Sequence, residues 1–186
     1  MGKPRFIYYT ATTLDGFIAD EADNLDWLLS QPIAEDGPMN YASFIRGIGV
    51  IAMGATTYEW IGAHELEVGG PWPYEIPCLV FTHRDLAPVA DSVHIVSGPP
   101  AEHRAALEAA AGDRDVWIVG GGDLAGQFAD AGMLDEMIVS IAPVTLGSGR
   151  PLFSRRFDLD LVEVVRNRAF ACARYAVVGP RDDPGA

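Results

Sequence analysis

The sequence has little cysteine and no long apolar run. Its two cysteines, Cys78 and Cys172, lie in apolar stretches and form no CxxC pair or Cys/His cluster, so we expect reduced core thiols and neither a metal site nor thiol catalysis. No stretch approaches the roughly 20 apolar residues that span a membrane. The apolar run at residues 6–9 is too short for a signal peptide, so the expected location is the cytoplasm.

Positive charge is also scarce, because 13 Lys and Arg residues stand against 26 Asp and Glu residues and leave a formal net charge of −13. Such a chain is repelled by nucleic-acid phosphates and anionic membranes, so neither is an expected partner. A small anion can still bind where basic residues gather locally. The candidates are Arg84, Arg150, Arg155 and Arg156, which either line a positive pocket or pair with surface carboxylates.

Two common catalytic or binding motifs are missing as well. The chain has no GxSxG elbow, which disfavours a Ser/His/Asp hydrolase, and no GxGxxG fingerprint, which disfavours an ordinary Rossmann site. What is present is ample apolar content, since 49% of the 186 residues are hydrophobic. That suffices for one domain, which we place at residues 1–179, with a frayed tail at 180–186.

Short apolar runs that alternate with helical stretches predict an α/β fold. Strands of a parallel sheet are expected at residues 5–13, 47–53, 76–82, 93–96 and 116–119. Helices are expected at 38–46, 56–61, 101–111 and 124–131, and a pocket-bordering loop at 62–75. Later strands at 134–143, 159–167 and 169–178 have no helix between them. The expected sheet is therefore mixed, mainly parallel, and completed by an antiparallel C-terminal hairpin.

The strand at 116–119 runs directly into Gly120-Gly121-Gly122-Asp123-Leu124 and then a helix. Glycines allow positive φ angles and close approach of a ligand, and the start of a helix attracts anionic oxygens, so this junction suits a phosphate. The alternative is a plain strand-to-helix turn in which Asp123 caps the helix.

Three other expected strands are followed by short segments that contain small, hydroxyl or basic residues. These are TLDGFIA at residues 13–19, MGATTYE at 53–59 and FTHR at 81–84. Because the carboxyl ends of parallel strands meet at one edge of an α/β sheet, we expect these segments and the glycine junction to form one ligand site.

Together these motifs resemble the dihydrofolate-reductase-like superfamily, most closely the reductase domain of the riboflavin-biosynthesis deaminase/reductase and its stand-alone relatives. The resemblance covers nearly the whole chain and includes IVGGGDLAGQF and SIAPVTLGSGRPLF in the family's order. The HxE and PCxxC motifs of the zinc deaminase half are missing. The resemblance implies a three-layer α/β/α fold, NADPH as cofactor and a homodimer.

The resemblance also implies that three turns hold NADPH. The first meets the phosphates and the nicotinamide end, the second receives the adenosine 2′-phosphate, and the third wraps the diphosphate and nicotinamide. The residues are Gly54, Thr56 and Thr57 in the first turn, Thr82, His83 and Arg84 in the second, and Gly120, Gly121, Gly122, Asp123 and Leu124 in the third. Two departures are Ala55, where many relatives carry a basic residue, and the acidic Asp123, which would repel a phosphate and which we expect to cap its helix.

By the same resemblance Asp15 lies over the nicotinamide, where it anchors or protonates the substrate; the alternative is an ordinary Asp15-Gly16 turn. Further candidates for substrate binding are Tyr8, Thr10, Asp26, Trp27 and Arg150. Tyr8 and Trp27 are equally explained as core residues, and Arg150 as part of a structural turn near a subunit contact.

Two functional hypotheses follow. The first is an NADPH-dependent reductase that transfers hydride to a small pterin-like, pyrimidine-ribosyl or carbonyl compound. The alternative is a nucleotide-binding module of the same fold without efficient catalysis. The residues do not identify the substrate.

Overall fold

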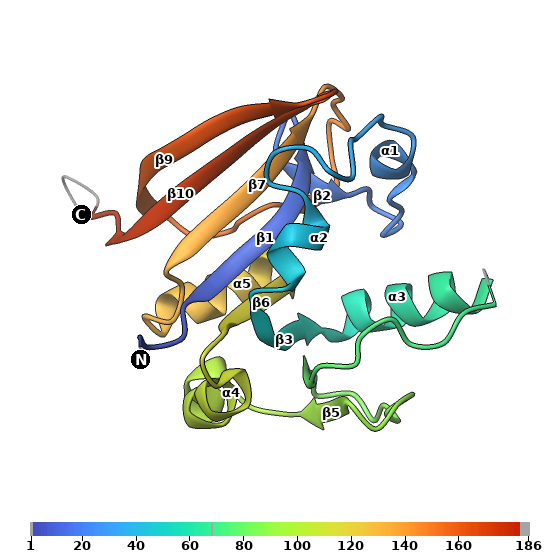
Figure 1. Ribbon diagram of the computed structural model, residues 1–186, viewed down its shortest axis with the longest axis vertical. Helices are drawn as coiled ribbons and strands as arrows, with labels where there is room; N and C mark the ends of the chain where they lie inside the picture. Colours follow the sequence, from blue (N-terminus) through green and yellow to red (C-terminus); the bar gives the residue numbers. More distant parts are fainter. Residues whose placement is uncertain (1, 68, 183–186) are drawn as a thin grey trace.

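An eight-stranded sheet forms the centre of the protein, whose computed structural model describes residues 2–67 and 69–182 (Figure 1). Its strands are β1 Phe6–Thr13, β3 Ile48–Gly54, β4 Cys78–Phe81, β5 Val93–Val96, β6 Asp115–Gly120, β7 Glu136–Ala142, β9 Phe157–Asn167 and β10 Phe170–Pro180. They lie in the order β5-β4-β3-β6-β1-β7-β10-β9. The strands from β5 to β7 are parallel, whereas β10 is antiparallel to both β7 and β9. The expected mixed sheet and C-terminal hairpin are confirmed.

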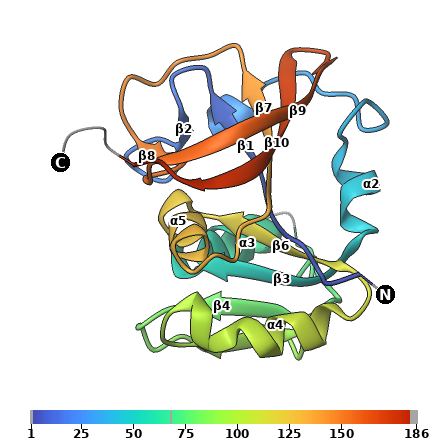
Figure 2. The same ribbon diagram turned by 90° about the vertical axis from the view of Figure 1, so that its left-hand side faces the viewer.

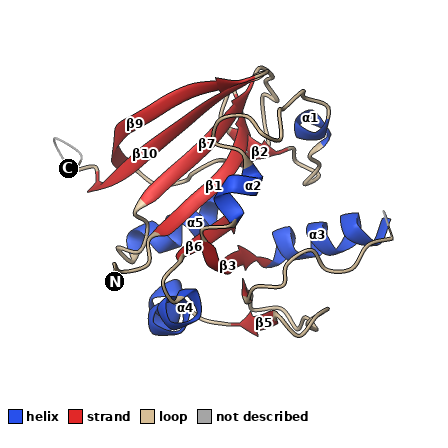
Figure 3. Cartoon of the chain, in the orientation of Figure 1, coloured by secondary structure: helices blue, strands red, loops and turns tan. Residues whose placement is uncertain are grey.

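Helices cover both faces of this sheet and give three layers (Figure 3). They are α1 Asp26–Leu29, α2 Tyr41–Ile45, α3 Ala55–Glu67, the 3-10 helix η1 Pro100–His103, α4 Arg104–Ala111 and α5 Gly122–Asp130. Helices α4 and α5 pack against one face of the sheet, and α2 and α3 pack against the opposite face. In Figure 2, α4 and α5 lie on the near side of β3 and β4. The expected three-layer arrangement is therefore present.

β3 shows why an apolar run becomes a central strand here. Val50 and Ala52 pack toward α4 and α5, whereas Ile51 and Met53 pack toward α2 and α3. Both faces are covered, so the strand is apolar throughout rather than alternating. Its last residue, Gly54, is only partly buried and lies at the carboxyl edge of the sheet.

α3 is longer than the sequence predicts. The expected helix ended at residue 61 and gave way to a loop at 62–75, but α3 continues through Gly62 to Glu67. Gly62 costs a helix about 1 kcal/mol relative to Ala. The buried side chains of Tyr58 and Ile61 fix the preceding turn against the sheet, and this packing offsets that cost.

The C-terminal hairpin continues further than expected. β10 reaches Pro180, and the Arg181 amide donates a 2.9 Å hydrogen bond to the Arg156 carbonyl. Arg181 also pairs with Asp158 at 3.1 Å. Ordered pairing thus includes the first part of the predicted tail, while residues 183–186 lie outside the described residues.

A small second sheet was not predicted. It pairs β2, Phe17–Ala19, with β8, Arg150–Pro151, and joins the segment after β1 to the segment after β7. Strands of three and two residues are too short to show a period in sequence. Among the described residues, none of the helices is both long and apolar enough to cross a membrane.

Candidate functional site

The glycine junction brings the carboxyl ends of β3 and β6 together. Gly120 ends β6 with φ +144°, a conformation that favours glycine, and the Gly120–Gly121 peptide bond is cis. A Cβ added to Gly54 would lie 3.7 Å from the Gly120 oxygen and 3.9 Å from the Gly121 nitrogen. Two of the three turns expected to hold the cofactor are therefore neighbours.

The other two glycines of the junction differ in what surrounds them. A Cβ on Gly122 would collide with the carbonyl oxygens of Pro151 and Leu152, so packing within the protein requires glycine there. Gly121 has an extended backbone, with φ −78° and ψ −176°, and its added Cβ would meet only Ile18 Cδ1, at 3.6 Å. Neither the φ and ψ angles of Gly121 nor packing against residues beyond its two chain neighbours requires glycine at this position.

The first turn of α3 lies beside the same junction. A Cβ added to Gly120 would be 4.0 Å from Thr57 Oγ1 and 4.0 Å from Tyr8 Cε2. Thr56, the neighbouring residue, is exposed. The start of this 13-residue helix presents backbone N–H groups and a positive dipole end, which together favour an anionic ligand.

The turn after β4 is held by two polar contacts. Thr82 Oγ1 accepts a 2.9 Å hydrogen bond from the Arg84 amide, and the Arg84 guanidinium donates to Glu59 Oε2 at 2.7 Å. Glu59 belongs to α3, so this ion pair fixes the turn beside that helix. His83 and Arg84 are exposed, while Thr82 is half-buried.

Asp123 does not cap α5. The N-cap is Gly121, which makes no side-chain cap bond, and the Asp123 carboxylate instead accepts from Gln127 at 2.9 Å and pairs with Arg155 at 3.3 Å. The capping expectation was therefore wrong, because α5 begins at Gly122 and Asp123 lies inside its first turn rather than at the N-cap position. Leu124 is buried in the core, so only its backbone is available to a ligand.

Asp15 is exposed and joins two loops. Its carboxylate accepts hydrogen bonds from Thr13 Oγ1 at 2.5 Å and from the Gly147 and Leu146 amides at 2.7 and 3.1 Å. The Thr13 bond, followed by the backbone bonds, lowers the pKa of Asp15 below its ordinary value of 3.8. An ionised carboxylate donates no proton, so this geometry favours the turn interpretation over proton donation.

The five residues expected to bind substrate do not converge. Tyr8 is fully buried and donates to the Leu152 carbonyl at 3.0 Å, and burial raises its pKa. Trp27 packs in a separate cluster with Phe170 and Cys172.

The remaining three have local partners. Thr10 Oγ1 donates to the Ala11 carbonyl, Asp26 is exposed and accepts from Asn24, and Arg150 forms a bidentate pair with Asp23 at 2.6 and 3.1 Å. For Tyr8 and Trp27 the core interpretation holds, and Arg150 joins β8 to the turn after β2.

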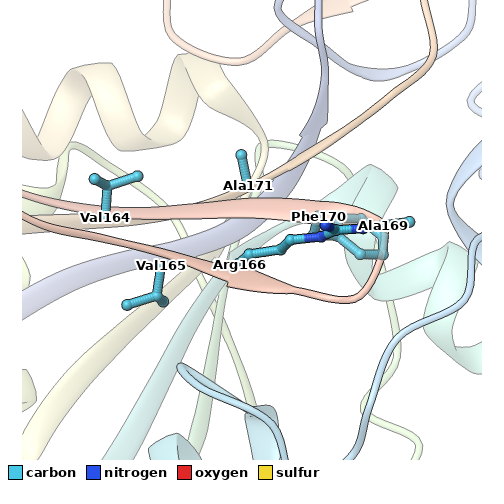
Figure 4. Close-up of a pocket in the computed structure, with 6 residues that line it drawn as sticks. All are labelled: Val164, Val165, Arg166, Ala169, Phe170 and Ala171. Atoms are coloured by element: carbon cyan, nitrogen blue, oxygen red, sulfur yellow. The ribbon is translucent and has the colours of Figure 1, made fainter.

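Two shallow hollows lie elsewhere on the surface. One, of about 390 Å³, lies on the β9–β10 hairpin, where Figure 4 shows Val164 and Ala171 on one side of the hairpin and Val165 on the other. The second, of about 250 Å³, lies between α2, β1, β7 and the hairpin. Its lining residues are Tyr9, Met39, Asn40, Ser43, Phe44, Ile138, Glu163 and Arg174.

Tyr9, and not the candidate Tyr8, is the tyrosine of β1 that lines a surface hollow. Its ring stacks on Phe44 with centroids 4.2 Å apart, its hydroxyl donates to the Met39 carbonyl at 3.0 Å, and burial raises its pKa to about 12. Successive side chains of a strand point to opposite faces, so choosing between the two tyrosines required knowing which face carries α2.

The fold and the glycine junction together define a dihydrofolate-reductase-like α/β protein. The family model of the RibD C-terminal domain matches residues 78–172. The uncharacterized protein YwjB of Bacillus subtilis (strain 168) is 32% identical over 148 residues, which cover 79% of this chain and 81% of YwjB. The chain belongs to the RibD C-terminal domain family.

Solved structures agree with this assignment. A Shewanella sp. PV-4 protein assigned to riboflavin biosynthesis superposes with a TM-score of 0.79 at 27% identity, over 94% of this chain and 99% of the other. Dihydrofolate reductase from Enterococcus faecalis, in complex with NADP(H), gives a TM-score of 0.57 at 15% identity, over 93% and 96% of the two chains. The second similarity shows a shared fold.

Proposed function

We propose that the protein is a reductase that uses NADPH to reduce a small pterin-like, pyrimidine-ribosyl or carbonyl compound. The observation that carries this proposal is Gly121, which directly follows β6 beside the end of β3 and is not required to be glycine by packing against residues beyond its chain neighbours. A ligand that approaches the backbone closely would account for it. Membership of a family that includes riboflavin-biosynthesis reductases supports the same function.

The residues around the junction fit a dinucleotide phosphate. Gly54 and Gly121 leave room for a diphosphate, the N-terminal turns of α3 and α5 supply N–H donors, and Arg84 offers a charge for a 2′-phosphate. When bound, the cofactor supplies the hydride. The backbone of the glycine junction and the first turns of α3 and α5 would bind the phosphates and orient the cofactor.

No side chain is assigned as proton donor. Asp15 is held as an ionised acceptor by Thr13 and the loop amides, and the Tyr8 hydroxyl donates to Leu152. We propose that the proton comes from water and that Asp15 holds the loop at residues 143–149 beside the end of β1. A direct hydrogen bond from substrate to Asp15 stays a prediction.

Cofactor titration and a turnover screen test the proposal. NADPH should bind more tightly than NADH by about 10- to 100-fold, since a charge-assisted contact contributes about 1.5–3 kcal/mol. Arg84→Ala should remove the preference. Equal affinities in the wild type would contradict the assignment of the 2′-phosphate site.

The screen follows NADPH absorbance over pterins, the riboflavin precursor and simple carbonyls. Oxidation of NADPH with one class of compound would support the reductase. Binding without turnover on any of these compounds would favour the alternative, a nucleotide-binding module. Absence of NADPH binding would contradict both.

A further inference from the structure

The arginine in the turn after β4, Arg84, already has an anionic partner. Arg84 Nη2 lies 2.7 Å from Glu59 Oε2, and the two side chains are 52% and 46% exposed. The Arg84 backbone is fixed separately, by the bond from its amide to Thr82 Oγ1. The guanidinium is thus held toward α3, while the turn itself does not depend on Glu59.

A phosphate that reaches this turn would meet both members of the pair. It would be attracted by Arg84 and repelled by the Glu59 carboxylate, with which it shares the guanidinium donors. An exposed ion pair is weak, so a doubly charged phosphate can displace the Glu59 carboxylate from Arg84. Breaking the Arg84–Glu59 pair costs free energy and therefore lowers the affinity for the phosphate. The same carboxylate has little effect on a ribose that carries only hydroxyls.

We propose that Glu59 determines cofactor specificity by competing with the 2′-phosphate for Arg84. The inference rests on the proposed function, because it assumes that a 2′-phosphorylated adenosine binds at this turn. Glu59 lowers the affinity for NADPH and leaves that for NADH nearly unchanged. The natural chain therefore discriminates between the two cofactors less strongly than Arg84 alone would allow.

The test compares Glu59→Gln with Glu65→Gln. Both substitutions remove one negative charge from α3 and keep the side-chain length, but in the structure it is Glu59 that pairs with Arg84. Dissociation constants are measured for NADPH, NADH, 2′,5′-ADP and AMP with purified full-length protein, so no substrate is needed. Melting temperatures check that each variant is folded.

Glu59→Gln should tighten NADPH and 2′,5′-ADP by about two- to fivefold, the range of an exposed ion pair, and leave NADH and AMP unchanged. Glu65→Gln should change none of the four appreciably. In the background of Arg84→Ala, Glu59→Gln should lose most of its effect, because the competition needs the guanidinium.

Three results would overturn the inference. Weaker NADPH binding by Glu59→Gln would mean that the carboxylate orients Arg84 for the phosphate. Equal tightening by both variants would indicate a general charge effect. Unchanged binding by Glu59→Gln in a protein that prefers NADPH would reject the role of Glu59 and leave the proposed function intact. If neither the wild type nor any variant binds any of the four nucleotides, both the role of Glu59 and the proposed function are rejected.

Discussion

At the level of single residues, the adjacent Gly121 and Gly122 differ in what a side chain at each position would contact. Gly121→Ala places its Cβ 3.6 Å from Ile18 Cδ1, an ordinary contact, so the fold should persist. NADPH affinity should fall at least about tenfold, equivalent to about 1.4 kcal/mol, because the methyl group occupies the space left for the ligand. Calorimetry on the folded variant measures this change.

Gly122→Ala is the matched control. Its Cβ would collide with backbone oxygens of Pro151 and Leu152, so we expect a loss of about 1–3 kcal/mol in unfolding free energy. Denaturant titration of both variants separates the two roles. If Gly121→Ala binds NADPH as the wild type does, the backbone at that position does not meet the cofactor.

The ionised carboxylate of Asp15 stabilises the loop that contains Leu146 and Gly147. Its pKa is lowered in the folded protein, so its contribution to stability is present above the ordinary pKa of 3.8 and is lost as the pH falls through the lowered value. Asp15→Asn should reproduce that loss at neutral pH. Hydrogen exchange at the Leu146 and Gly147 amides should become faster in the variant, while NADPH affinity stays the same and turnover falls.

Each readout answers a different question. Unchanged exchange at the two amides would contradict the role of Asp15 in holding the loop. Faster exchange with normal turnover would leave Asp15 a turn residue whose loop does not matter for the reaction.

At the level of elements, α3 offers a test of how packing overrides local preference. Gly62 lies within this helix, and an added Cβ would meet nothing within 4 Å. Gly62→Ala should therefore raise the unfolding free energy by about 0.5–1 kcal/mol and the melting temperature by roughly 1–4 °C. Thermal denaturation measures the change, and a lower melting temperature would mean that Gly62 has a further role.

Gly49→Ala is the opposite case. Gly49 lies in β3, and its Cβ would collide with the backbone of Ala111 at the end of α4. This substitution should lower the melting temperature. That result would indicate that the higher melting temperature of Gly62→Ala comes from the open space around residue 62 and not from a general stabilising effect of alanine.

The same elements show what sequence can predict. The buried run of β3 and the hairpin of β9 and β10 were evident because apolar period and turn residues agree with the tertiary fold. The end of α3 could not be predicted from the sequence, because a glycine such as Gly62 commonly ends a helix. Here the buried side chain of Ile61 packs against the sheet, and the helix continues past Gly62.

The candidate site divides in the same way. Its backbone elements could be predicted, since glycines and threonines at strand ends are local signals. The partners of side chains could not, because Asp15 with Gly147 and Arg84 with Glu59 depend on contacts across 132 and 25 residues of sequence.

At the level of the whole molecule, β9 leaves an apolar surface uncovered. It is the last strand of the sheet and is 11 residues long. Leu159, Leu161 and Val164 are exposed and lie opposite Val177, Tyr175 and Ala173 of β10, which places them on one face of the hairpin. An edge strand with such a face is a site of association, so we expect the homodimer that the family resemblance implies to form through this hairpin.

Val164→Asp tests this interface against Val89→Asp, since the two valines are 61% and 60% exposed and Val89 lies in the loop before β5. Light scattering should give twice the chain mass of 20.0 kDa for the wild type and for Val89→Asp, and about the chain mass for Val164→Asp. Added salt should strengthen the dimer, because each chain carries a net charge of −13 and salt screens the repulsion between copies. A monomeric wild type at micromolar concentration would contradict the dimer, and a Val164→Asp variant that stays dimeric would place the interface elsewhere on the surface.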